Sequence, residues 1–180
     1  PRWYRPDIAT PAFNNILGAC YIFERDTTGS WNQRGLLPDN YGGFGNGFGH
    51  AVAIDHTHII VGAFGYAMAF VYENTNPPSW TQQKIDDPNP FNPSSTFGEA
   101  VAVSGDRVIV GSENDRGSLF GAAYIYKLDP SNTFSPWTLE IKLQTTQECR
   151  NFGKAVAISD SIAVVSAIKT DGTSLLCIFE

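Results

Sequence analysis

One short segment occurs three times along the chain, and this repetition constrains the fold more than any other feature. The copies read FGHAVAI from residue 48, FGEAVAV from residue 97 and FGKAVAI from residue 152. Their spacing of about 50 residues indicates a repeat architecture, in which every copy contributes one small unit of structure. Because a single unit of that size cannot bury its apolar side chains alone, we expect neighbouring units to pack against each other.

Two further segments recur in a fixed order with the first. An aromatic segment reads CYIFE from residue 20, AFVYE from residue 69, AYIYK from residue 123 and LCIFE from residue 176. A tryptophan segment reads SWNQRGLL from residue 30, SWTQQKI from residue 79 and PWTLEIKL from residue 136. This order predicts one repeat region over residues 1–180, with a partial unit at 1–37, complete units at 48–85 and 97–143, and a partial unit at 152–180.

Each complete unit has the pattern of four short strands. In the unit at 48–85 these strands are FGHAVAI, HIIVGA, AMAFVYE and SWTQQKI, with turn-forming residues between them. The segments are rich in β-branched and aromatic residues, and the first two are apolar on both faces, which is typical of a sheet covered on both sides. We therefore predict an all-β fold, a β-propeller of four-stranded antiparallel blades with about 3.5 to 4 blades in this chain, forming an open arc or part of a larger propeller.

Small and large residues at fixed positions indicate how the units pack. A glycine follows each repeated phenylalanine, at Gly49, Gly98 and Gly153, where it permits a bulge or the close approach of a neighbouring backbone. A tryptophan begins each fourth strand, and its large ring suits the space between two sheets, so we expect three core tryptophans. These are Trp31, Trp80 and Trp137.

Taken together, the three segments resemble the FG-GAP repeat, best known from the propellers of integrin α-subunits. The Phe-Gly signature is kept in all three copies, whereas the Gly-Ala-Pro signature is reduced to GAF at 62–64, GSE at 111–113 and SAI at 166–168. The resemblance implies a β-propeller, usually of about seven blades. It also implies a location outside the cell or on its surface, and a role in adhesion or ligand capture.

Metal sites are not expected. Integrin-like repeats often carry a calcium loop between the first and second strands, but here that place reads DHTH, SGDR and SDS, which is too short and too poor in carboxylates. We interpret Glu113 and Asp115, on a later loop, as solvated acids. His50, His56 and His58 form a histidine grouping that would need a further ligand to hold zinc, so we interpret it as a plain exposed turn.

The usual signatures of enzymes are absent from the sequence. It has no Gly-x-Ser-x-Gly elbow, no His-Glu-x-x-His and no phosphate-binding loop, so we predict no catalytic residues, no cofactor and no enzymatic activity. His50, Glu99 and Lys154 follow the repeated glycines, and their different charges favour a solvated rim over a shared ligand site. Loop aromatic residues are binding candidates, although caps on the blades are the favoured interpretation. They are Tyr41, Phe44, Phe64, Tyr66 and Phe91.

The net charge of the chain restricts the classes of partner that we expect. A net charge of −6 with few basic residues argues against nucleic acid and anionic membranes as partners. No apolar run approaches the ~20 residues that span a bilayer, and no signal-peptide pattern begins the chain, so we expect a soluble protein without membrane insertion. Cys20 and Cys177 lie in apolar segments and are expected to be buried thiols. Cys149 is expected in a polar loop, where a disulfide or an intermolecular bridge stays open.

We therefore expect a non-catalytic module, extracellular or at the cell surface, that mediates protein–protein adhesion or assembly. An open arc would leave unpaired strand edges, which natural proteins seldom leave uncovered, so the expected partner is another protein or other copies of this chain. A glycan-binding propeller lectin and an accessory domain of a larger secreted enzyme are the alternative functions. Kelch and WD propellers are the alternative folds, but neither a recurring Gly-Gly pair nor a Trp-Asp ending is present.

Overall fold

The computed structural model confirms the all-β fold. It describes residues 18–39, 45–76, 79–89, 94–115, 121–146 and 148–180. Within these residues lie fourteen strands and one short 3₁₀ turn, η1 (Phe64–Tyr66). The beginning of the unit predicted at 1–37 lies outside the described residues.

The strands form four successive sheets, each built from neighbouring hairpins. The first sheet pairs β1 (Ala19–Arg25) with β2 (Trp31–Pro38). The second sheet contains β3 (Phe48–Ile54), β4 (His58–Ala63), β5 (Met68–Asn76) and β6 (Ser79–Asp86), in that order. The third sheet repeats this arrangement with β7 (Ala100–Ser104), β8 (Arg107–Ser112), β9 (Ala122–Leu128) and β10 (Trp137–Leu143).

The fourth sheet differs because its first strand is interrupted. Its strands are β11 (Cys149–Arg150), β12 (Val156–Ser159), β13 (Ile162–Lys169) and β14 (Ser174–Phe179). Both β11 and β12 pair with β13, on either side of a break at Phe152 and Gly153, and β14 pairs with the other edge of β13. The short strand β11 therefore extends the first strand position of this sheet to residues before the Phe-Gly pair.

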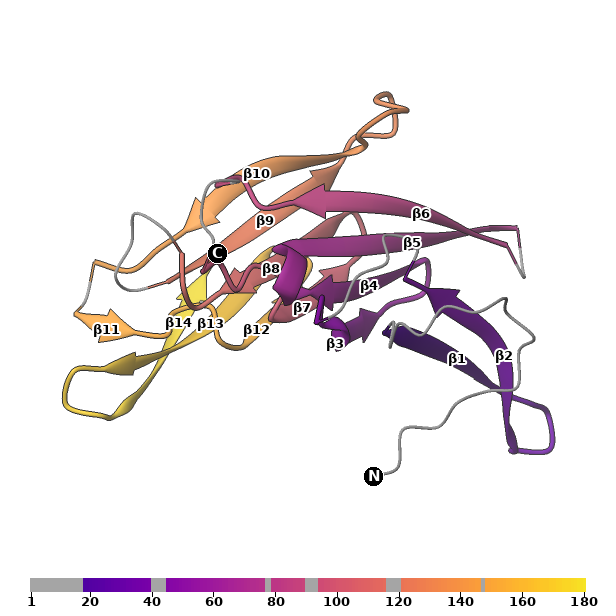
Figure 1. Ribbon diagram of the computed structural model, residues 1–180, viewed down its shortest axis with the longest axis horizontal. Coiled ribbons are helices and arrows are strands. Elements are labelled where there is room, and N and C mark those ends of the chain that lie inside the picture. Colours follow the sequence, from indigo (N-terminus) through magenta and orange to yellow (C-terminus); the bar gives the residue numbers. More distant parts are fainter. Residues whose placement is uncertain (1–17, 40–44, 77–78, 90–93, 116–120, 147) are drawn as a thin grey trace.

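The sheets stack into an open arc. Figure 1 shows the first sheet at one end, the β11–β14 sheet at the other, and the second and third sheets between them. The first strands β3, β7 and β12 lie side by side along the stack. This arrangement agrees with the predicted partial propeller, and the arc does not close on itself in the described part of the chain.

An apolar core lies between each pair of neighbouring sheets. On the third strand of the second sheet, Ala69 and Val71 pack toward the third sheet, whereas Phe70 and Tyr72 pack toward the first sheet. The third strand of the third sheet has the same arrangement, since Tyr124 and Tyr126 of β9 face the second sheet. Because side chains alternate along a strand, β5 and β9 present aromatic side chains backward and aliphatic side chains forward along the chain. The fourth sheet differs, since β14 presents Leu175, Cys177 and Phe179 backward.

The repeated glycines allow neighbouring backbones to come close. A Cβ atom on Gly98 would lie 2.3 Å from the carbonyl oxygen of Met68, and one on Gly153 would lie 2.1 Å from that of Ala122. Both glycines also have a positive φ, 94° and 92°, which other residues rarely adopt. The expected role of the Phe-Gly glycines in close approach is therefore confirmed at the joint between the second and third sheets and at the joint between the third and fourth.

The neighbouring strand contributes glycine to the same contact. A Cβ atom on Gly62 of β4 would lie 2.0 Å from the carbonyl oxygen of Gly98, and one on Gly111 of β8 would lie 2.0 Å from that of Gly153. The Phe-Gly segments of the third and fourth sheets thus insert into a site that only glycine leaves open. We call this site the Phe-Gly socket.

Some burial predictions are wrong. Trp137 is buried and Trp80 is half-buried, but Trp31 is 67% exposed because it lies on the backward face of the first sheet, which no described sheet covers. Cys149 is buried in β11 rather than placed in a polar loop, and all three cysteines are free thiols. Cys20 and Cys177 are half-buried.

The Phe-Gly socket predicts that a single added methyl group lowers the stability of the protein strongly. Gly111→Ala places a Cβ atom against the carbonyl oxygen of Gly153, so the joint between the third and fourth sheets must open. We expect a loss of about 1–3 kcal/mol in the free energy of unfolding, measured by urea titration. Gly35→Ala is the matched control, because its nearest contact is an ordinary 3.4 Å to a side-chain carbon of Ile22. Equal midpoints for the two variants would contradict the socket.

Candidate interaction surface

The forward face of the fourth sheet is apolar and uncovered. Alternate residues of β13 and β14, such as Val165 and Cys177, point into the core shared with the third sheet. The residues between them point outward, with Leu176 62% exposed and Ile178 61% exposed. We name the outward set the forward face: Ile162, Val164, Ser166, Ile168, Leu176 and Ile178.

The backward face of the first sheet is uncovered as well. Cys20 and Ile22 of β1 pack against the second sheet, so the alternate residues of β1 point away from it. Phe23 is 53% exposed, and Trp31 lies on the same side of the sheet through its pairing with Arg25. We name Tyr21, Phe23, Arg25 and Trp31 the backward face of the first sheet.

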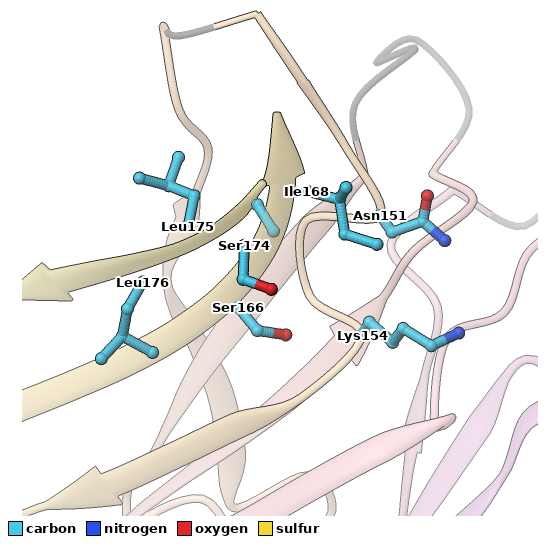
Figure 2. A pocket seen from close by; sticks show the side chains of 8 residues that line it. Asn151, Lys154, Ser166, Ile168, Ser174, Leu175 and Leu176 are labelled. Atoms are coloured by element: carbon cyan, nitrogen blue, oxygen red, sulfur yellow. The ribbon is translucent and has the colours of Figure 1, made fainter. Parts of the chain in front are cut away.

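A hollow of about 350 Å³ lies at one end of the forward face. It is lined by residues of β13 and β14 together with Asn151 and Lys154. Figure 2 shows the side chains of Ser166, Ser174 and Leu176 along this hollow, with Lys154 at its border. The ammonium group of Lys154 is turned to Glu113, at 2.9 Å from its carboxylate.

The hollow occupies the position of a Phe-Gly socket. In the third sheet, the backbone N–H of Gly98 donates to the carbonyl of Gly111, and in the fourth sheet that of Gly153 donates to the carbonyl of Ser166. Ser166 is therefore the counterpart of Gly111. By the same register, Ser174 is the counterpart of Gly121, whose added Cβ would lie 2.1 Å from the carbonyl oxygen of Phe152.

The histidine grouping does not gather in the structure. His50 is exposed with its ring 4.7 Å from that of Phe64, and His56 is exposed in the turn before β4. His58 is buried rather than exposed, with its ring 5.3 Å from that of Trp137 in the third sheet. The prediction of a plain exposed turn is therefore wrong for His58, because the neighbouring sheet covers it.

Asp115 is also buried rather than solvated, at 4% exposure. Its carboxylate accepts hydrogen bonds from the Tyr124 hydroxyl at 2.7 Å, the Asn89 amide at 3.0 Å and the Lys142 ammonium at 2.6 Å. Burial, followed by the hydrogen bond to Asp115, raises the pKa of Tyr124 above its usual value. Since these three donors come from the chain itself and engage both carboxylate oxygens, the network joins loops and strands rather than forming a ligand site.

The other candidate residues are separated. Glu113 is half-buried and its carboxylate holds both Lys154 and Asn151, the latter at 2.7 Å. His50 packs on Phe64, so the residues after the repeated glycines have different partners and form no shared site. Among the described residues there is no group of three potential metal-ligating side chains.

Only two loop aromatic candidates fall within the described residues. Phe64 and Tyr66 belong to η1 and are half-buried. Tyr41, Phe44 and Phe91 lie outside the described residues.

The forward face was not predicted from the sequence, although the sequence contains a signal for it. When the units are compared, serine replaces glycine at position 166 and leucine replaces alanine at position 176.

The architecture defines a partial β-propeller of stacked antiparallel sheets. The family model described as FG-GAP repeat matches residues 80–126, which run from β6 through the Phe-Gly pair at 97 into β9. The chain therefore carries an FG-GAP repeat, and the resemblance is confirmed. No curated protein matches the chain. No helix in the described part of the chain is long and apolar enough to cross a membrane.

The Asp115 network is expected to hold the third sheet together. Asp115→Ala removes the acceptor of three donors, so we expect a loss of about 2–3 kcal/mol in the free energy of unfolding. Lys142→Met is the control and should cost less, because the carboxylate keeps the Tyr124 and Asn89 donors. Urea titration of both variants measures the difference between their free energies of unfolding. A urea midpoint of Asp115→Ala equal to that of the unaltered protein would contradict a stabilising role of the network.

Proposed function

We propose that the chain is a non-catalytic module that mediates protein–protein adhesion or assembly through the uncovered faces of its end sheets. The observation that carries this proposal is the contrast between equivalent faces. Leu176 and Ile178 are exposed in the fourth sheet, whereas their counterparts Ala123 and Ile125 are buried beneath it in the third sheet. Contiguous apolar surface of this kind is typical of interaction sites.

The number of apolar side chains on each face is enough for association. Burial of one leucine or isoleucine side chain contributes about 1.5–3 kcal/mol. Several such side chains on one face can therefore offset the loss of translational and rotational freedom on binding, about 4–15 kcal/mol. Apolar burial is therefore the proposed main source of affinity, beside the polar side chains of Ser166, Ser174 and Lys154 that line the hollow.

The strand edge of the fourth sheet favours a protein as the partner over a glycan. In the described part of the chain, β14 pairs with β13 alone, so its other edge presents free backbone donors and acceptors. A protein segment supplies both apolar side chains for the face and backbone groups for the edge. A glycan supplies neither apolar side chains nor a β-strand.

The proposed location of this module is outside the cell or at its surface, on the strength of the resemblance to the propellers of integrin α-subunits. Exposed lysines such as Lys127 and Lys169 provide a test. A membrane-impermeant amine reagent applied to intact cells, and to their medium, should label the protein. Labelling that occurs only after the cells are opened would contradict this location.

Photo-crosslinking in the native setting tests the proposed function. A benzophenone amino acid at position 176 or 23 should form covalent adducts with protein, identified by mass spectrometry, because both positions lie on uncovered faces. Position 134 is the control, since Phe134 is 99% exposed in the β9–β10 connection and lies on neither face. The absence of protein adducts at both 176 and 23 would overturn the proposal.

A further inference from the structure

We draw no further inference here: the strongest candidate, the apolar forward face of the fourth sheet with the hollow beside Ser166 and Ser174, is the surface already assigned to the proposed function, and nothing in the structure shows what covers it.

Discussion

The contact of one backbone with a glycine of the preceding sheet is the constraint on which the whole stack depends. At Gly62 and Gly111 the carbonyl group of the next Phe-Gly segment lies where any side chain would stand. This contact brings the first strands of successive sheets side by side and sets the distance at which aliphatic and aromatic faces interdigitate.

The repeat could be predicted from sequence because it depends on local pattern. Strand-forming segments, turn residues and the three markers recur in register, so the existence, order and approximate bounds of the sheets follow from elementary propensities. The Phe-Gly glycines could also be assigned a role in close approach, since a glycine that follows the same aromatic residue in every copy marks a position where a side chain does not fit.

Burial at particular residues could not be predicted in the same way, because it depends on which sheet lies opposite. Trp31 and Trp137 begin equivalent strands, yet one is exposed and the other buried, since only the second has a neighbouring sheet on its side. His58 and Asp115 read as surface residues in sequence, but a ring of Trp137 covers the first and three donors surround the second. The candidate surface follows from the same comparison, because equivalent faces differ only in whether they are covered.

A stack of this kind has a graded resistance to opening. Within the described residues, the second and third sheets are each held on two sides, whereas the first and fourth are held on one, and β12 is only four residues long. In a quasi-one-dimensional array, the terminal units fray while the middle stays closed. Backbone amides of β4 and β8 should therefore exchange with solvent deuterium most slowly, and a ligand at either end would extend that protection outward from the centre.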